Sequence, residues 1–326
     1  MRSDPMSVLP SSAAPPSTPR RAGLAPALAA LFFAGFAAAV PAQLASAVHV
    51  VTADNRDCSP TNSCAALLGT SWYSGYLERD HLAIANWNPA GGPGVYYPAP
   101  IADFEFIPVL GGPSYAYLTG PEVELPFGAA FNVLTVRGGG GALSCIYRHF
   151  STVGNIVGNT TFLDELALNS HPDAFVLVLP YTFSNPANIG VFYDSSRLQW
   201  GIFNEDLTAM DPSTWFTVYD DSCDIGLGNR YHLTCVGTIG NECGLGGLGD
   251  GDPGAKILVT QRWQEGAGVY NPHPIGVYYA AGTWKVFNED LAVMPAGVHF
   301  NVADIRVLLN DDFESADFTA WTAVAP

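Results

Sequence analysis

The segments Ile275-Gly-Val-Tyr-Tyr279 and Trp284-Lys-Val-Phe-Asn-Glu-Asp-Leu-Ala-Val-Met294 are each written twice in this chain. Their earlier copies are Ile189-Gly-Val-Phe-Tyr193 and Trp200-Gly-Ile-Phe-Asn-Glu-Asp-Leu-Thr-Ala-Met210, with the tryptophans 84 positions apart (284 − 200). A more divergent copy is marked upstream by Phe131-Asn-Val133. Self-similarity at a fixed period predicts about three repeated modules of roughly 80–85 residues.

The tryptophan segment has the alternation of a β-strand. Trp284 and Val286 fall on one strand face, while Lys285 and Phe287 fall on the other. The chain is also rich in aromatic residues, with 34 glycines and 25 prolines, and it lacks long lysine- or glutamate-rich stretches. We therefore expect a mostly β fold of sandwich- or barrel-like modules.

The Asn-Glu-Asp triplet that follows the strand predicts a short helical turn in each module. Asn288 fits a helix N-cap, Leu291 and Met294 would point into the core, and Pro295 would end the turn. The alternative is an acidic metal or catalytic site. The first module has Thr119-Gly120-Pro121 at this place, which favours the structural role. The motif residues interpreted as structural are Trp200, Asn204, Asp206, Trp284, Asn288 and Asp290.

Residues 1–47 have the features of a secretory signal peptide. Arg20-Arg21 precede the apolar run 22–40, and small-residue cleavage sites end at Ala42 and Ala47. No later run approaches the roughly 20 apolar residues that span a bilayer. We expect a secreted bacterial protein at the extracellular side or cell surface, with the periplasm as alternative, and no membrane insertion of the mature form.

The charge balance argues against two classes of anionic partner. The chain has 13 basic and 30 acidic residues, and its formal net charge is −17. Such an acidic chain is not expected to bind nucleic acid by neutralising phosphates. It is also not expected to adhere electrostatically to anionic membranes.

The repeat predicts the domain organisation. The expected parts are the signal peptide, three β modules and a C-terminal tail, at residues 1–47, 48–137, 142–220, 229–309 and 310–326. The tail is similar to short aspartate-, phenylalanine- and serine-rich endings of secreted bacterial proteins, which implies sorting or attachment. Whether the modules form beads, a solenoid or one closed unit is left open by the sequence.

Six cysteines after an export signal predict disulfides. The expected pairs are Cys58–Cys64, Cys145–Cys223 and Cys235–Cys243. A zinc site is the alternative, although no C-x-x-C pair occurs.

Two further groups of residues suggest metal sites. His49, His149 and His232 open the three modules and could bind one ion if the modules met around one axis. Asp250-Gly-Asp252 has the composition of a calcium turn, with an ordinary loop as the alternative. We expect no obligatory cofactor.

The motif segments resemble an uncharacterised module of exported bacterial proteins. The residues that carry the resemblance are Asn271-Pro-His-Pro-Ile-Gly-Val-Tyr-Tyr279, Trp284 to Pro295 and Phe300-Asn-Val302. Modules two and three match this pattern, and module one matches at its ends. The family has no assigned activity, so the resemblance implies secreted β repeats and identifies no functional residue.

Two functions compete. The first is a non-catalytic extracellular repeat protein, structural or adhesive, that binds an extracellular ligand such as a glycan or self-associates. Its candidate ligand-contact aromatics are Trp87, Tyr96, Tyr97 and Trp263, which could instead belong to the core. The alternative is a secreted hydrolase of extracellular polymers. The sequence contains no G-x-S-x-G or H-E-x-x-H motif, but acid pairs stay open.

Overall fold

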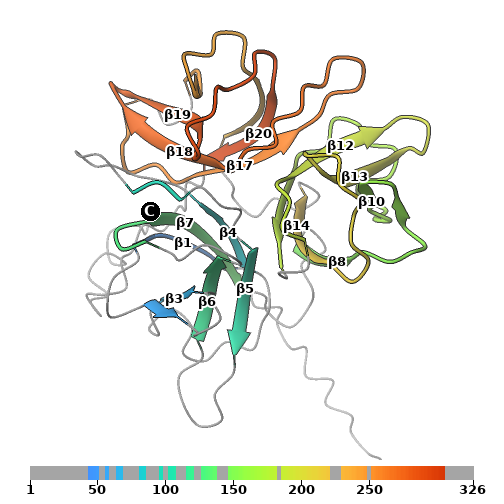
Figure 1. The fold of residues 1–326 in the computed structure, drawn as a ribbon, viewed down its shortest axis with the longest axis horizontal. Coiled ribbons are helices and arrows are strands. Elements are labelled where there is room, and N and C mark those ends of the chain that lie inside the picture. The colour runs from blue at the N-terminus through green and yellow to red at the C-terminus, as the bar shows by residue number, and fades with distance from the viewer. Residues whose placement is uncertain are drawn as a thin grey trace, which may run out of the picture. The chain divides into compact units, whose positions relative to one another are not determined.

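The computed structural model describes backbone and side chains for residues 95–97, 126–132, 146–181, 185–220, 229–247 and 251–304. It describes the backbone of strand residues at 43–50, 56–58, 64–68, 81–85, 102–107, 115–120 and 133–137. These parts contain strands and turns and no helix, so the predicted mostly β fold is confirmed (Figure 1).

The strands fall into three consecutive groups, called set 1, set 2 and set 3. Set 1 contains β1 (Gln43–Val50), β2 (Arg56–Cys58), β3 (Cys64–Leu68), β4 (His81–Ala85), β5 (Ala102–Ile107), β6 (Tyr115–Gly120) and β7 (Ala130–Arg137). Set 2 contains β8 (Ile146–Phe150), β9 (Ile156–Val157), β10 (Thr160–Phe162), β11 (Val176–Pro180), β12 (Ile189–Asp194), β13 (Gln199–Asn204) and β14 (Trp215–Asp220). Set 3 contains β15 (Arg230–Thr234), β16 (Glu242–Gly244), β17 (Ile257–Arg262), β18 (Ile275–Ala280), β19 (Thr283–Asn288) and β20 (His299–Asp304).

Each set has the same order of strand pairing. Its last strand lies between two others in an antiparallel sheet, in the orders β1-β7-β4, β8-β14-β11 and β15-β20-β17. The remaining strands pair as β2-β3-β6-β5, β9-β10-β13-β12 and β16-β19-β18. In set 3 a single bridge between Ile239 and Glu242 stands where the other sets have an outer strand. This common order is consistent with the predicted repeat.

The motif tryptophans lie at the centre of the core. Trp200 and Trp284 are both 0% exposed. Their indole N–H groups donate to the carbonyl oxygens of His171 and Asp252, each at 2.9 Å, so the polar end of each buried ring is satisfied. Val286 and Phe287 are buried too, as expected for a strand packed on both faces.

The predicted helical turn is wrong. The chain turns directly after Asn204 and after Asn288, with Leu207 at φ 63° and Leu291 at φ 64°. Leu291 is 55% exposed instead of buried, whereas Met294 is buried as predicted. Asn288 does not accept hydrogen bonds from a first helical turn; its Nδ2 donates to the carbonyl of Ala292 at 3.1 Å. Asparagine suits both roles, because its amide can accept or donate.

The three sets contact one another in a cycle. β12 of set 2 pairs in parallel with β17 of set 3, at Gly190–Gln261 and Val191–Arg262. The corresponding strands β18 and β4 contact each other between sets 3 and 1, and β5 contacts β11 between sets 1 and 2.

The first strand overlaps the predicted signal peptide. β1 begins at Gln43 and pairs with β7 from Gln43–Arg137 onward, so residues 43–47, which lie between the two predicted cleavage sites, form part of a sheet. The rest of the predicted signal and the tail lie outside the described residues. Within the described part of the chain, there is no helix with the length and apolar character to cross a membrane.

Candidate functional site

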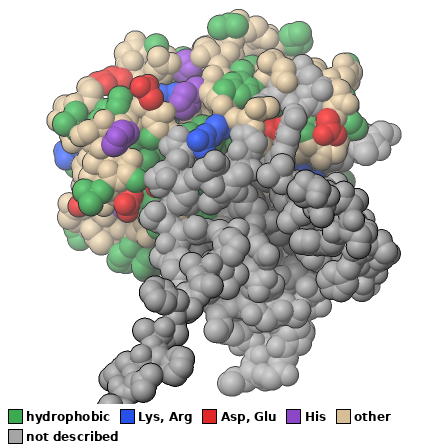
Figure 2. All heavy atoms as spheres, turned by 180° about the vertical axis from the view of Figure 1, so that it is seen from behind, with side chains coloured by type: hydrophobic (Ala, Val, Ile, Leu, Met, Phe, Trp, Pro, Cys, Tyr) green, Lys and Arg blue, Asp and Glu red, His purple; other side chains and the backbone are tan. Residues whose placement is uncertain are grey.

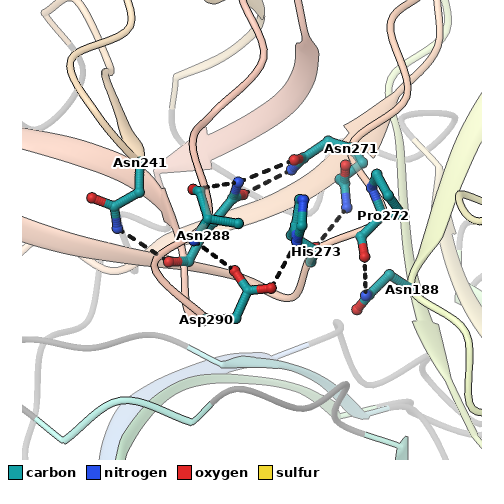
Figure 3. Close-up of polar contacts among 9 residues, drawn as sticks. Asn188, Asn241, Asn271, Pro272, His273, Asn288 and Asp290 are labelled. Atoms are coloured by element: carbon teal, nitrogen blue, oxygen red, sulfur yellow. Dashed lines mark hydrogen bonds and ion pairs between the residues drawn. The ribbon is translucent and has the colours of Figure 1, made fainter.

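Two buried asparagines connect the motif segments of set 3. Asn271 Nδ2 donates to Asn288 Oδ1 at 2.9 Å, and Asn288 Nδ2 donates back to Asn271 Oδ1 at 3.1 Å (Figure 3). Both side chains are 0% exposed. Asn241 Nδ2 donates to the Asn288 carbonyl at 3.2 Å. The pair satisfies amides that would be costly to bury alone, and it fixes the loop after β19 against the loop before β18.

Set 2 contains a similar arrangement, with one amide–amide hydrogen bond in place of two. Asn185 Nδ2 donates to Asn204 Oδ1 at 2.7 Å, and Asn159 Nδ2 donates to the Asn204 carbonyl at 3.0 Å. Asn204 Nδ2 in turn donates to the carbonyl of Thr208 at 3.1 Å. Asn204 and Asn288 therefore hold equivalent loops.

The motif aspartates bind within their own sets. Asp206 Oδ1 accepts from the backbone N–H and the hydroxyl of Thr208, at 3.0 and 2.6 Å. Asp290 Oδ1 accepts from the N–H of Ala292, and its Oδ2 lies 2.7 Å from His273 Nδ1 (Figure 3). The histidine is specific to set 3, because Ala187 occupies its place in set 2.

Glu205 has a different partner from that of its neighbour Asp206. Glu205 is 3% exposed, and its Oε2 accepts from the backbone N–H of Asn271 in set 3 at 2.9 Å. A Cβ on Gly190 would overlap Glu205 Oε1 and would lie 2.7 Å from Cζ of Phe203. The glycine therefore leaves the space that the carboxyl fills. Burial raises the pKa of Glu205 to about 7. We call these four residues the Glu205 joint.

Glu289 forms the same joint between sets 3 and 1. It is 3% exposed, and its Oε2 accepts from the backbone N–H of Tyr97 at 3.0 Å. A Cβ on Gly276 would overlap Glu289 Oε1 and lie 2.8 Å from Cε1 of Phe287. Burial raises the pKa of Glu289 to about 8. Gly276, Phe287, Glu289 and Tyr97 are called the Glu289 joint.

The sequence of set 1 has neither the glutamate nor the glycine of these joints. Asn288 and Glu289 lie 12 and 11 positions before Phe300, which aligns with Phe131 in set 1. The same distances before Phe131 lead to Thr119 in place of the asparagine and Gly120 in place of the glutamate. Phe104, and no glycine, stands opposite Leu118, the counterpart of Phe287. Where the glutamate is missing, the glycine opposite it is missing too.

A second series of links uses the asparagine of the Phe-Asn-Val segments. Asn132 Nδ2 in set 1 donates to the Ile257 carbonyl in set 3 at 3.0 Å. Asn301 Nδ2 in set 3 donates to the Val176 carbonyl in set 2 at 2.7 Å. Both asparagines are 0% exposed. Set 2 has Thr217 at this position, so the asparagine series has two members as the glutamate series does.

The candidate aromatic residues lie beside the joints. Trp263 is half-buried, 6.0 Å from Phe192 and 6.4 Å from Tyr270 between ring centroids. Tyr270 is 42% exposed, and its ring lies edge-on to Phe203 at 5.9 Å. The structure therefore brings Trp263 together with a tyrosine that was not among the predicted candidates.

Tyr96 repeats the geometry of Tyr270. It is also 42% exposed and lies edge-on to Phe287 at 5.9 Å. Tyr97 is a core residue at 2% exposure, and Trp87 lies outside the described residues. A sequence signal could have identified Tyr270: the segment Tyr96-Tyr-Pro-Ala-Pro-Ile101 aligns with Tyr270-Asn-Pro-His-Pro-Ile275.

One predicted disulfide is present in the described residues. Cys235 and Cys243 are bonded, with their Cα atoms 5.8 Å apart. Cys58 and Cys64 are opposite each other in the β2–β3 pairing, although their side chains are not described. Cys145 and Cys223 lie outside the described residues, so those two bonds stay predictions.

The predicted equivalence of the module-opening histidines is wrong. His49 stands opposite Phe131 and His149 opposite Phe216, but His232 stands opposite Asn301, and Leu233 takes the place opposite Phe300. A shift of one residue moves a side chain to the other face of a strand, so His149 and His232 do not occupy equivalent positions. His149 Nε2 lies 2.7 Å from Thr161 Oγ1. Asp252, from the predicted calcium turn, accepts from the N–H of Gly254 at 2.9 Å.

In the comparisons with known proteins, one family model matches the segments that contain most of the residues described above. Residues 120–220 and 247–303 match the Domain of unknown function (DUF7452). No match was found among curated proteins or solved structures. The matched residues contain both buried glutamates, both core tryptophans and Tyr270, while Tyr96 and Tyr97 precede them. This similarity agrees with an uncharacterised module.

Proposed function

We propose that this chain is an exported, non-catalytic repeat protein that binds a polymeric ligand, such as a glycan, outside the cell. The predicted signal peptide supports export. The strongly acidic composition supports an uncharged or cationic partner over a nucleic acid. On the described part of the face in Figure 2, lysine and arginine side chains do not gather into an extended patch.

The observation that carries this proposal is that the two motif glutamates are buried in contacts between the sets. Hydrolysis of a glycosidic bond most often uses two carboxyl groups that flank the bond and reach the substrate. Glu205 and Glu289 are each 3% exposed and each bind a backbone N–H of the next set. Their neighbours Asp206 and Asp290 bind residues of their own sets. These contacts support a role of the recurring acidic residues in assembly of the fold.

The proposed ligand contacts are Tyr270 with Trp263, and Tyr96 at the equivalent joint. Each tyrosine exposes 42% of its surface while its ring edge is held by a buried phenylalanine. Rings held in this way lose little conformational freedom on binding and can stack on the apolar face of a sugar. Two such positions would allow two weak contacts to one polymer chain to reinforce each other.

The test is retention of the purified chain on insoluble polysaccharides. We expect retention by at least one polymer of a panel containing cellulose, chitin and peptidoglycan, reduced several-fold by Tyr270→Ala and by Tyr96→Ala. Phe150→Ala is the matched control. Phe150, on β8 of set 2, is also an exposed aromatic residue (36%), and its ring stacks on that of Trp215. No retention, or retention that both tyrosine variants preserve, would contradict this assignment of ligand contacts.

The same panel tests the hydrolase alternative. Soluble sugar released by the wild-type chain, and lost in Glu205→Gln or Glu289→Gln at unchanged stability, would overturn the non-catalytic proposal. Light scattering on the chain eluting from a size-exclusion column tests self-association separately. A large assembly would favour the structural form of the proposal.

A further inference from the structure

We propose that the Glu205 and Glu289 joints form a proton-dependent closure, in which each joint is tight while its carboxyl is neutral and loosens when the carboxyl ionises. The inference concerns the stability of the closed cycle of sets and does not depend on the ligand.

The geometry favours a neutral carboxyl at both joints. In the described residues, the hydrogen-bond donor to the Glu205 carboxyl is the N–H of Asn271, and Oε2 accepts it at 2.9 Å. The other oxygen, Oε1, faces Gly190 and the edge of Phe203. An ionised carboxylate can accept several hydrogen bonds, and burying it beside apolar groups with one donor is costly. Glu289 has the same surroundings, with Tyr97 as donor.

The charged groups around the joints do not offset this burial. Asp206 and Asp290 follow the glutamates in the chain, but they bind Thr208 and His273. The guanidinium of Arg262, on the strand paired with β12, lies over the Trp200 ring. Among the described residues, the other titratable neighbours named by ring contacts or hydrogen bonds are the phenols Tyr270 beside Phe203, and Tyr96 and Tyr97 at the Glu289 joint. Burial raises the pKa of each glutamate, and the single backbone hydrogen bond lowers it by a smaller amount.

The sign of the effect follows from the raised pKa values. Between the ordinary glutamate pKa of 4.5 and about 7, the folded chain keeps the Glu205 proton that the unfolded chain releases. For Glu289 this window extends to about 8. The stabilisation is fully present below the ordinary pKa and is lost as pH rises through the folded value. Each glutamate then increases the unfolding constant up to about tenfold per pH unit within its window.

The two joints are expected to respond at different pH values. The set 2–set 3 joint loosens first, because the pKa of Glu205 is about 7, and the set 3–set 1 joint follows, because that of Glu289 is about 8. The contact between sets 1 and 2 contains no equivalent glutamate, because Gly120 occupies that position in set 1. No pH response of this kind is therefore expected there.

Amide hydrogen exchange at the two donor residues provides a local readout. We would measure the protection of the Asn271 and Tyr97 amides between about pH 5 and pH 9, corrected for the intrinsic pH dependence of exchange. The wild-type chain is expected to lose protection at Asn271 around neutral pH, and at Tyr97 roughly one pH unit higher. Glu205→Gln should make the protection of Asn271 independent of pH, because glutamine imitates the neutral carboxyl.

Glu265→Gln is the matched control, because Glu265 is an exposed glutamate that accepts from Ser195 Oγ at 2.8 Å across the same pair of sets. It should leave both profiles unchanged. Equal profiles for wild type and Glu205→Gln would overturn the proposal. If the variant does not fold, carbon-13 NMR titration of the wild-type glutamate carboxyls decides: midpoints of both groups near the ordinary value of 4.5 would also overturn it.

Discussion

Glu205 and Gly190 occupy complementary space across the β12–β13 pairing: the carboxyl oxygen of the one fills the position where a Cβ of the other would stand. Gly276 and Glu289 repeat the relationship in set 3. The glycine of the Ile-Gly-Val motif is therefore not explained by its own strand, where glycine is unfavourable. It is explained by the buried carboxyl opposite, which connects one set to the next.

Replacing Gly190 by alanine should destabilise the chain by about 1–3 kcal/mol, because the added methyl group overpacks against Glu205 and Phe203. Urea unfolding near pH 6 measures the change. The double variant Gly190→Ala/Glu205→Ala should cost less than the sum of the single variants, with a coupling of about 0.5–3 kcal/mol. Strict additivity would show that the two residues do not share this space. Gly237→Ala is the control, because nothing lies within 4 Å of its added Cβ.

Asn288→Ala should cost about 1–3 kcal/mol, because it leaves the buried amide of Asn271 without its partner. Adding Asn271→Ala should cost little more, since both members of the pair are then absent. The free energy of unfolding of the two single variants and the double variant checks this. Two fully independent losses would contradict the paired geometry shown in Figure 3.

The strand pattern and the core could be predicted from sequence because they depend on local alternation. Trp284 and Val286 are buried as their period of two requires, and Phe287 is buried on the opposite face of the strand. A continuous apolar run such as that of β11 is typical of a strand buried on both faces, and all five residues of β11 are buried. The loop after Asn288 was predicted as a helix because an asparagine followed by acidic residues and then proline suits both structures.

The joints could not be predicted in the same way. The partner of Glu205 is a backbone N–H 66 positions away, and a backbone donor leaves no mark in the sequence. The histidine comparison failed for a related reason. His232 lies in the expected segment, but the pairing of β15 with β20 places Leu233 in the position that His149 takes in set 2. A register of one residue depends on cross-strand packing, which a single sequence does not display.

His149 should make the chain less stable in acid. Burial lowers its pKa from 6.5 to about 4, so the unfolded chain binds the proton first. Stability from this group is present above pH 6.5 and is lost as pH falls through about 4, opposite in sign to the glutamates. His149→Gln, which keeps a hydrogen-bonding group towards Thr161, should flatten urea-unfolding stability over this range. His171→Gln is the exposed control, and equal acid slopes in both variants would contradict the role of His149.

The Cys235–Cys243 disulfide should contribute about 2–3 kcal/mol by closing a short loop of the unfolded chain. The variant Cys235→Ser/Cys243→Ser isolates this bond from the other two predicted pairs. Thermal unfolding should show a lower midpoint with the β-sheet circular dichroism spectrum preserved. An unchanged midpoint would indicate that the bond does not constrain the unfolded chain.

Export processing should cut after Ala42 and not after Ala47. Cleavage at Ala42 leaves Gln43, the first residue of β1, as the new terminus and preserves the whole β1–β7 pairing. Cleavage at Ala47 would remove residues 43–47, which pair with residues 133–137 of β7. That part of β7 would lose its neighbour on the β1 side, although residues 133–135 would still pair with β4. N-terminal sequencing of the exported protein identifies the site. A chain of residues 43–326 should also unfold at a higher urea concentration than one of residues 48–326. A mature terminus at Val48 with equal stability would show that these five residues are dispensable to the sheet.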